Sequence, residues 1–470
     1  MELDISDANL RGTSSLTLAQ SLFLSISRLS FPFLLESGNC GLPDISRYSF
    51  MGAEPFISMK SVEGIVTVRE KGEEIEIAGD PFHVLHTLLG RFRQESHPIF
   101  PFTGGAVGYI GYEAAQYIES VPDRKGDHLS IPDMSFSFYD TVVVVDHDSD
   151  KVYIASSGFP AEGEERERRS AERAAYFRDI IMTPSGETDA GFFKTGPLSS
   201  NCGREDYMDG VEKIKRYIAE GDVYQANLSQ RFSASFEGEP FKLYTKLAEL
   251  NPVPFGAYLS YPDFSVISNS PERFLFLREG RLETRPIKGT MARSAARDMD
   301  EAGRQRLRES AKDGAEHIMI VDLERNDLGR VCRYGTVRVD EMKMIESYSN
   351  LHHMVSVVSG QVLEGMGPVD CIRAAFPGGS ITGAPKVRAM EIINEVEPNP
   401  RWIYTGSMGY IGFDGTMDLN IAIRTALVKA GKIYFSVGGG IVADSDPGSE
   451  YEETMLKGAV FRAMAAGGEE

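Results

Sequence analysis

The sequence predicts an α/β protein of the α+β type, a large two-lobed structure of stacked, mainly antiparallel β-sheets flanked by helices. The chain has 470 residues, of which 42% are hydrophobic and 25% charged, a composition typical of a globular protein with a large core. Short apolar runs follow one another through tight turns, as in hairpins, rather than through strand–helix–strand crossovers. Stretches with apolar residues at helical spacing separate these hairpins.

The N-terminal part is predicted to consist mainly of short strands. Residues 141–145 (TVVVV) and 152–154 (VYI) are apolar, and residues 102–112 (FTGGAVGYIGY) alternate glycine with aromatic and β-branched residues. The last pattern indicates a strand that another backbone approaches closely. Residues 161–182 are dense in Glu and Arg, with apolar residues at helical spacing, which predicts a solvated amphipathic helix.

A change of composition indicates where two domains meet. Residues 183–201 are rich in Pro, Ser, Gly and Thr, as is typical of a linker. We therefore expect an N-terminal subdomain at residues 1–182 and a C-terminal domain at residues 202–466. Helices are expected in the latter at residues 205–219, 241–250 and 298–310, from about residue 313, and from 447 to about 465, with a strand at 223–236 and hairpins between them.

Composition excludes several kinds of partner. The formal net charge is −20 and no block of basic residues occurs, so nucleic acid and anionic membranes are poor partners. The apolar run 16–35 is interrupted by Arg28 and Pro32, which predicts that it does not span a membrane. The four cysteines are dispersed without zinc-site spacing, as expected of reduced thiols in a cytoplasmic protein.

The segment RPIKGT (285–290) carries the residue on which the functional prediction depends. A strand-like run at 273–277, a turn at Glu279–Gly280 and a second run at 281–284 precede it. A hairpin is therefore expected to bring Lys288 to a fixed place. A lone lysine is more often a solvated surface charge, so the other polar groups of the chain decide between these interpretations.

The last predicted helix offers a candidate cation site. Glu450, Glu453 and Lys457 are spaced i, i+3 and i+7, which places them on one helical face. Paired carboxylates suit a hard divalent cation, although a surface Glu–Lys pair explains the same spacing. The preceding loop contains Gly438–Gly440, whose backbone N–H groups could bind an anion or simply form a turn.

Further polar residues indicate related chemistry. Asp313 and Glu316 open an apolar helix, either as ligands or as complements of the helix dipole. His352–His353 precede a β-branched run, where one buried, hydrogen-bonded histidine is expected. Arg424 is expected at a strand position, from which it could bind a carboxylate through two hydrogen bonds. Together these residues indicate Mg²⁺, a polyanionic small molecule and a nearby lysine.

The block from Glu205 to Lys457 closely resembles the chorismate-utilising enzymes, and the N-terminal third resembles them more loosely. The resemblance implies a large α/β structure with stacked antiparallel sheets. The matching stretches are LLES (34–37), GYIGYE (108–113), GDVYQANLSQRF (221–232), SNSPERF (268–274), RPIKGT (285–290), AEHIMIVDLERNDLGRV (315–331), HHMVS (352–356), FPGGSITGAPKVRAMEII (376–393), GSMGYIGFDGTMDLNIAIRT (406–425) and GGGIVADSDPGSEYEET (438–454).

Within this family, three features resemble the aminodeoxychorismate synthase branch. Anthranilate synthases usually have alanine where this chain has Lys288. Isochorismate and salicylate synthases place a general-base lysine where this chain has Gln225. Residues 251–255 (NPVPF) also resemble the aminodeoxychorismate branch. Anthranilate synthase component I, which aminates C2 of chorismate and releases pyruvate in tryptophan biosynthesis, is the alternative.

The resemblance implies a covalent mechanism. Lys288 would attack ring C2 of chorismate while the C4 hydroxyl leaves, and ammonia would then displace the lysine by attack at C4. Glu272 would act as general acid and base, with His353 as a supporting polar group. A free lysine amine has a pKa of about 10.4, so a lowered pKa is expected of the nucleophile.

The same resemblance implies the binding residues. Glu316 and Glu453 would bind Mg²⁺, with Glu450 and Asp313 around them, and the ion would hold the ring carboxylate. The expected substrate contacts are Thr290, Ser380, Tyr404, Arg424, Gly438, Gly439, Gly440 and Lys457.

Ammonia is expected from a separate glutamine amidotransferase subunit. None of the four cysteines lies in a Gly-x-Cys-x-Gly nucleophile turn, and a separate glutaminase is usual in this family. The chain ends soon after the chorismate-binding block, so no fused lyase is expected. The product would be 4-amino-4-deoxychorismate, the precursor of 4-aminobenzoate in folate biosynthesis.

The segment LLES (34–37) resembles the tryptophan-binding segment of anthranilate synthases. A tryptophan-like pocket formed by Glu36, Ser37, Pro254 and Phe255 is therefore one expectation. A simple segment at the edge of a sheet is the other.

Overall fold

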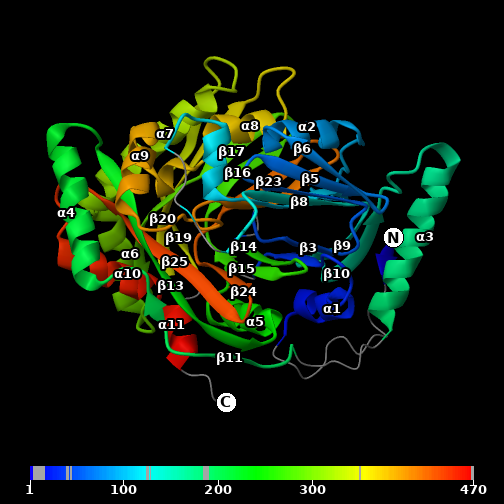
Figure 1. Cartoon of the computed structure of the whole chain (residues 1–470), viewed down its shortest axis with the longest axis horizontal. Coiled ribbons are helices and arrows are strands. Elements are labelled where there is room, and N and C mark those ends of the chain that lie inside the picture. Colours follow the sequence, from blue (N-terminus) through cyan, green and yellow to red (C-terminus); the bar gives the residue numbers. More distant parts are fainter. Residues whose placement is uncertain are drawn as a thin grey trace.

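The computed structural model describes residues 1–3, 16–38, 42, 45–122, 126, 129–183, 190–348 and 351–466. Two large sheets stack on each other at the centre of the molecule, and helices cover their outer faces (Figure 1). Every strand pairing in the described part of the chain is antiparallel. The predicted fold class is confirmed.

The first sheet has 13 strands among the described residues, in the order β1-β10-β9-β3-β2-β14-β15-β24-β25-β13-β11, with β12 and β21 also paired to β13. Their bounds are β1 (Glu2–Leu3), β2 (Phe33–Glu36), β3 (Tyr48–Gly52), β9 (Thr141–Asp146), β10 (Lys151–Ser156), β11 (Phe193–Thr195), β12 (Ser199–Ser200), β13 (Gln225–Gly238), β14 (Phe255–Ser260), β15 (Phe264–Ser270), β21 (Gly383–Ala384), β24 (Thr425–Lys429) and β25 (Lys432–Ile441).

The second sheet has 12 described strands, in the order β18-β20-β17-β16-β23-β22-β7-β8-β4-β5-β6, with β19 paired to β20. Their bounds are β4 (Ile57–Val62), β5 (Ile65–Glu70), β6 (Glu73–Ala78), β7 (Gly105–Ile110), β8 (Met134–Tyr139), β16 (Arg273–Arg278), β17 (Arg281–Arg285), β18 (Ile287–Ala292), β19 (Arg338–Ser347), β20 (Leu351–Gln361), β22 (Ser407–Gly412) and β23 (Met417–Ile421).

Three hydrophobic cores follow from this layering. An aromatic-rich core that includes Phe50, Phe102 and Tyr410 fills the space between the sheets. On the outer face of the first sheet pack α1 (Leu18–Ile26), α3 (Gly163–Met182), α5 (Pro240–Leu250) and α11 (Ala459–Ala466). The helices α2 (Pro81–Gly90), α7 (Ala311–Gly329) and α8 (Pro368–Ala375) pack on the outer face of the second sheet, whereas α9 (Lys386–Val396) packs mainly against β13 of the first sheet. The other helical elements are η1 (Tyr112–Tyr117), α4 (Arg204–Glu220), α6 (Arg297–Glu309), η2 (Gly379–Ile381) and α10 (Pro447–Lys457).

The two helices with predicted acidic ligands, α7 and α10, have side-chain caps that fix where they begin. Ser310 caps α7 by accepting a hydrogen bond from the Asp313 backbone N–H at 3.2 Å. Asp446 caps α10 by accepting from the Ser449 N–H at 2.9 Å, and Pro447 follows it at the first helical position. The first turns of both helices, which carry Asp313 and Glu450, are thereby held in place.

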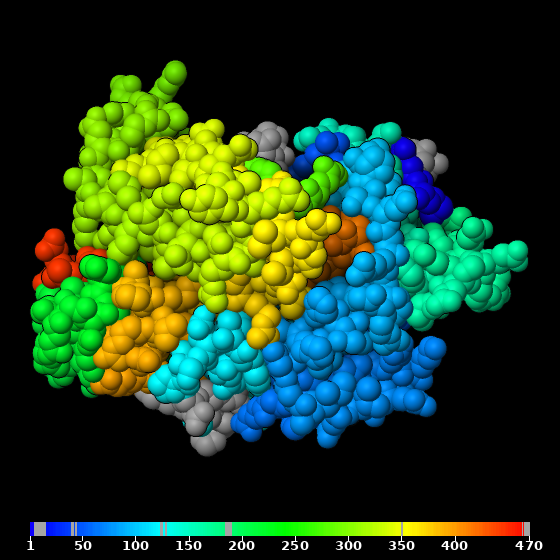
Figure 2. All heavy atoms as spheres, turned by 90° about the horizontal axis from the view of Figure 1, so that it is seen from above, coloured from blue at the N-terminus to red at the C-terminus, as the bar shows by residue number. Residues whose placement is uncertain are grey.

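Both predicted domains contribute to each sheet, with the strands of each domain forming one contiguous half of the sheet. In the first sheet β2 lies beside β14, and in the second β7 lies beside β22. Seen from above, blue N-terminal residues and yellow-green residues of the second half form one continuous surface (Figure 2). Arg373 of α8 also pairs with Asp80, which precedes α2. Within the expected linker, β11 and β12 both pair with β13, while residues 184–189 lie outside the described residues. The boundary at 183–201 stays a prediction.

Lys288 lies in strand β18, directly after the predicted hairpin of β16 and β17. Other local predictions were wrong in detail. Gly438–Gly440 belong to strand β25 rather than a loop. Arg424 lies between two strands with a φ of +49°, and the LLES segment lies inside its sheet, not at an edge. The last predicted helix is interrupted at Gly458 to give α10 and α11. Patterns of alternation show that a strand exists but not which strands flank it.

Two expectations from composition can be compared with the structure. No helix in the described part of the chain has the length and apolar character needed to cross a membrane. Cys202, Cys332 and Cys371 are free thiols, and Cys40 lies outside the described residues.

Candidate active site

Lys288 and Glu316 form the centre of the site. Lys288 Nζ lies 3.0 Å from Glu316 Oε2, and the two side chains are 19% and 14% exposed. Strand β18 brings the lysine there, with a register shift against β20 between Ile287 and Thr290. Gly289, with a φ of +88°, permits this shift, because it adopts the left-handed region at no steric cost. The pair joins the second sheet to the first turns of α7.

Glycine at position 440 lets strand β25 approach this lysine. A Cβ atom on Gly440 would lie 2.5 Å from Gln225 Nε2 and 3.0 Å from Lys288 Nζ, so a larger residue would clash with both side chains. At Gly438–Gly440, one edge of β25 pairs with β13. The pairing of its other edge with β24 ends earlier, at Phe435. The other edge of the glycine segment makes no strand pairing in the described structure.

Helix α10 presents its carboxylates to the same strand. Lys457 Nζ lies 2.7 Å from Glu453 Oε1 and donates a hydrogen bond to the Gly438 carbonyl at 3.0 Å. A Cβ on Gly439 would lie 3.2 Å from Glu450 Oε2 and 3.9 Å from Glu453 Oε1. Burial raises the pKa of Glu450. At Glu453 burial also acts to raise the pKa, but Lys457, Lys288 and Lys312 together outweigh it and lower the pKa. Strand β25 therefore lies next to the carboxylates of both helices. It contacts α10 at Gly438 and Gly439, and it reaches Glu316 of α7 through Lys288.

Glu272 is a buried carboxylic acid beside the lysine strand. Its Oε1 accepts hydrogen bonds from Ser380 Oγ at 2.8 Å and from the Ile287 N–H at 3.2 Å. Burial raises the pKa of Glu272 to about 7, although Ser380, Ile287 and the positive charges of Lys288 and Arg424 oppose this rise. A carboxyl group that exchanges its proton near neutral pH is suited to general acid and base catalysis.

Arg424 and His353 complete the polar lining. Among the described residues no carboxylate lies within ion-pair distance of Arg424, and burial lowers the pKa of its guanidinium group. His353 Nδ1 is 2.8 Å from Thr290 Oγ1, and its Nε2 has no hydrogen-bond partner in the described structure. Burial, with Arg424 nearby, lowers the pKa of His353 to about 3, so the imidazole is neutral at pH 7. A half-buried arginine without a described ion-pair partner is suited to an anionic ligand.

Tyr404 is the predicted contact with the weakest link to this cluster. It is buried, and the Arg401 guanidinium lies 5.9 Å from its ring centroid. Burial raises the pKa of its hydroxyl group well above the usual value. Its described hydrogen bonds are made by its backbone, to Arg401 and Thr405.

The carboxylates expected to bind Mg²⁺ already have partners. Glu316 pairs with Lys288, and Asp313 Oδ2 accepts a hydrogen bond from Ser310 Oγ at 2.5 Å. No three His, Cys, Asp or Glu side chains in the described ranges lie close enough together to bind one metal ion. The donor set, made of carboxylates, still fits a hard cation by its chemistry. Binding at Glu316 would require its ion pair with Lys288 to open.

Some residues near the site were absent from the predicted set. Gln225, used only as a family marker, is fully buried, and neither of its amide atoms has a hydrogen-bond partner in the described structure. Asn227 Oδ1 likewise has none there, and Ser445 Oγ donates to Glu450 Oε1 at 2.7 Å. The sequence did contain a signal for these residues. Polar residues occupy alternate positions of the apolar strand 223–236, so they share one face of the strand, and that face can line a site.

The predicted tryptophan-like residues line a separate cavity of about 720 Å³. Glu36, Ser37, Pro254 and Phe255 all contribute to it, together with Arg273 and other charged residues of the second sheet. The Glu36 carboxylate, however, accepts hydrogen bonds from three donors of the fold: Thr17 Oγ1 at 2.6 Å, Gln20 Nε2 at 2.9 Å and Tyr244 OH at 2.7 Å.

The two-sheet fold and this arrangement of lysine, arginine and carboxylates define an enzyme family. The family model described as chorismate binding enzyme matches residues 54–463. The chain belongs to this family, which confirms the predicted class of enzyme.

Relatives with two different names are similarly close. The chain is 40% identical over 440 residues to "Aminodeoxychorismate synthase component 1" of Bacillus subtilis, covering 93% of this chain and 92% of the relative. It is 38% identical over 460 residues to "Anthranilate synthase component 1" of Acetivibrio thermocellus, covering 96% and 93%. Among solved structures, anthranilate synthase component I from Streptococcus pneumoniae superposes with a TM-score of 0.78 at 31% identity, covering 89% of this chain and 92% of that one.

Proposed function

We propose that this chain catalyses the Mg²⁺-dependent amination of chorismate to 4-amino-4-deoxychorismate in the cytoplasm, as a step toward 4-aminobenzoate and folate. The observation that carries the proposal is Lys288, a partly buried amine beside Glu316 and Gly440. Identities of 40% and 38% do not separate the two named branches. The lysine does separate them, since anthranilate synthases are expected to have alanine there.

Substrate binding follows from the charges of the site. Chorismate carries two carboxylates, and Arg424, which has no ion-pair partner among the described residues, is available to one of them. Lys457 and the glycine edge of β25 would hold the other end, and Thr290 and Ser380 would lie along the ring. Mg²⁺, held by Glu316 and Glu453 with Glu450 and Asp313 around them, would neutralise the ring carboxylate.

The covalent step uses two residues. After the Lys288 ammonium group has released a proton to water, its amine forms a bond to ring C2 as the ring double bond shifts and the bond from C4 to its hydroxyl oxygen breaks. Glu272 donates its proton to that oxygen, so that water leaves. Ammonia then bonds to C4, the double bond shifts back, and Lys288 departs as an amine. Glu272, now ionised, takes the surplus proton from the new ammonium group.

The geometry supports these roles. Glu272 accepts a hydrogen bond from the N–H of Ile287, the residue immediately before Lys288, so acid and nucleophile are held on one short segment. The pKa of Glu272, about 7, allows it to give and take a proton in one cycle. Neutral His353 supports the segment through Thr290.

Ammonia is proposed to come from a glutamine amidotransferase subunit. The relatives are named as component 1, which implies a further component. In the chain itself no cysteine has the sequence context of a glutaminase nucleophile. Added ammonium at high pH, where free ammonia is abundant, should therefore replace the partner.

One assay tests the proposal. The full chain is incubated with chorismate, Mg²⁺ and ammonium, with and without an added lyase that converts 4-amino-4-deoxychorismate to 4-aminobenzoate. We expect 4-aminobenzoate only when the lyase is present. Lyase-independent release of pyruvate with fluorescent 2-aminobenzoate would instead identify the anthranilate synthase reaction. No consumption of chorismate under either condition would refute both.

A further inference from the structure

A second buried carboxyl group lies behind Glu272. Glu324 and Asp327, one helical turn apart on α7, are each only 3% exposed. Lys386 of α9 pairs with Asp327 at 2.7 Å and also donates to the Ala375 carbonyl at 2.7 Å. None of these three residues is used in the covalent steps described above.

Glu324 contacts the turn that carries a hydrogen-bond donor of Glu272. Its Oε1 accepts from the Gly379 N–H at 3.2 Å, and the next residue, Ser380, donates to Glu272 Oε1 at 2.8 Å. Its Oε2 lies 3.4 Å from Thr284 Oγ1. Glu324 and Glu272 therefore bind consecutive residues of the short turn η2, one through the backbone and the other through a side chain.

The turn fits tightly against α7. A Cβ atom on Gly379 would lie 2.6 Å from Leu323 Cδ2 and 3.3 Å from Glu324 Oε1, so only glycine fits there without movement. A displacement of this turn would change the distance from Ser380 Oγ to Glu272, because Ser380 is the next residue. Within the described chain, Glu324 is the side chain that binds the Gly379 N–H.

We propose that Glu324 is a positioning residue for Glu272: it anchors turn η2 so that the Ser380 hydroxyl group stabilises the ionised form of the general acid. The catalytic meaning of this role rests on the proposed function. The hydrogen-bond relay itself does not, and it can be measured without substrate.

The charges around the relay are consistent with this role. Glu272 faces Lys288 from β18, Arg424 from the segment before β24, and Glu324. Burial and Asp327 raise the pKa of Glu324 to about 8, with Lys386 opposing. At neutral pH Glu324 is then mainly a neutral acid, which can anchor the turn without placing a second negative charge near Glu272. A neutral glutamine should do the same.

Infrared titration of the carboxylic-acid C=O band tests the relay. The Glu272 band is assigned by its loss in Glu272→Gln. We expect Glu324→Leu, which removes the acceptor, and Ser380→Ala, which removes the donor, to raise the Glu272 midpoint by similar amounts of about one pH unit. The double variant should shift no further than either single variant. Glu324→Gln should stay at the wild-type midpoint.

Control variants make each outcome decisive. Glu324→Asp keeps a carboxyl group but withdraws it from Gly379, so it should shift the midpoint as well, and it replaces Glu324→Leu if that variant does not fold. Asp140→Asn, at a buried carboxyl group in another part of the molecule, should leave the midpoint unchanged. An unchanged midpoint in Glu324→Asp and Glu324→Leu, or additive shifts in the double variant, would overturn the proposal.

Kinetics separate this proposal from the proposed function. If wild-type protein turns over chorismate with ammonium, Glu324→Asp should lower kcat about tenfold at unchanged chorismate affinity, and Glu324→Gln should recover most of it. Wild-type protein that consumes no chorismate would refute the proposed function and leave the infrared result to decide on Glu324.

Discussion

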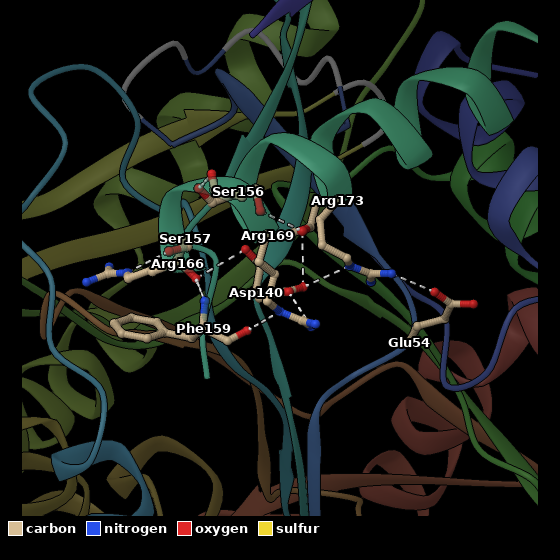
Figure 3. Close-up of polar contacts among 10 residues, drawn as sticks. Glu54, Asp140, Ser156, Ser157, Phe159, Arg166, Arg169 and Arg173 are labelled. Carbon is tan, nitrogen blue, oxygen red and sulfur yellow. Dashed lines mark hydrogen bonds and ion pairs between the residues drawn. The ribbon is translucent and has the colours of Figure 1, made fainter. Parts of the chain in front are cut away.

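Two buried carboxyl groups, Asp140 and Glu272, show how this chain uses polar residues in different ways. Asp140 lies between β8 and β9, 1% exposed, and accepts hydrogen bonds from Arg169 at 2.8 Å, Thr141 at 3.0 Å and Arg173 at 3.4 Å (Figure 3). Arg173 continues the network to Glu54 at 2.9 Å. The network attaches α3, whose sequence is largely charged, to the first sheet.

Around Glu272 the pattern is different. Its side chain has two described hydrogen-bond donors and no ion-pair partner, and Arg424 close to it has no carboxylate partner among the described residues. Gln225 and His353 Nε2 are buried without described hydrogen bonds. Unsatisfied buried polar atoms cost about 1–3 kcal/mol each, a cost that a bound ligand can remove. Buried polar groups that are hydrogen-bonded within the fold, as at Asp140, hold elements together. Buried polar groups without such bonds, as near Glu272, indicate a site for a ligand.

The largest effect is expected from Lys288→Met. Removing the proposed nucleophile should lower chorismate turnover by on the order of 10³-fold or more while leaving the fold intact, because the lysine side chain is at the rim of the core. Intact-mass spectrometry of protein mixed with chorismate and Mg²⁺ should show an adduct in wild type and none in the variant.

Lys457→Met is the matched control for Lys288→Met. It removes another lysine that pairs with a glutamate of the site, at Glu453, so it should weaken chorismate binding without abolishing the adduct. Equal adduct in wild type and Lys288→Met would exclude Lys288 as the nucleophile.

An intermediate effect is expected at Glu36. Although it lines the 720 Å³ cavity, its carboxylate is satisfied by Thr17, Gln20 and Tyr244 in the way that Asp140 is satisfied by its neighbours. Glu36→Ala should lower the free energy of unfolding by about 2–4 kcal/mol, measured by denaturant titration, with turnover per folded molecule unchanged. Unchanged stability together with lost tryptophan binding in calorimetry would show that Glu36 serves a ligand instead.

Much of the fold and part of the site follow from local sequence. Helical spacing predicted that Glu450, Glu453 and Lys457 share a face, and α10 places them there. The segment 161–182 was predicted as a charged helix and is α3. Both predictions depend only on the helical spacing of residues within one helix, and this spacing can be read directly from the sequence.

Relations between distant segments could not be predicted in the same way. The Gly440 backbone next to Gln225, and Glu324 against the turn before Ser380, depend on strand and helix neighbours far apart in the chain. Alternation cannot give strand order, and buried acids on an apolar helix look like ordinary helix residues until their partners are known. Arg424 was expected in a strand, but its φ of +49° between β23 and β24 turns it into the site.

The smallest effect is expected from Arg169→Ala in the Asp140 network. Arg169 donates to Asp140 Oδ2 at 2.8 Å and to the Phe159 carbonyl at 2.9 Å. Because Arg173 and Thr141 still satisfy the carboxylate, the loss should be only about 1–2 kcal/mol of unfolding free energy. Arg178 lies on the same helix, and its ion-pair partner among the described residues is exposed Asp179, so Arg178→Ala should cost less than about 0.5 kcal/mol. Denaturant titration of both variants would separate a buried anchor from a surface pair, and equal losses would show that α3 is attached by its apolar residues alone.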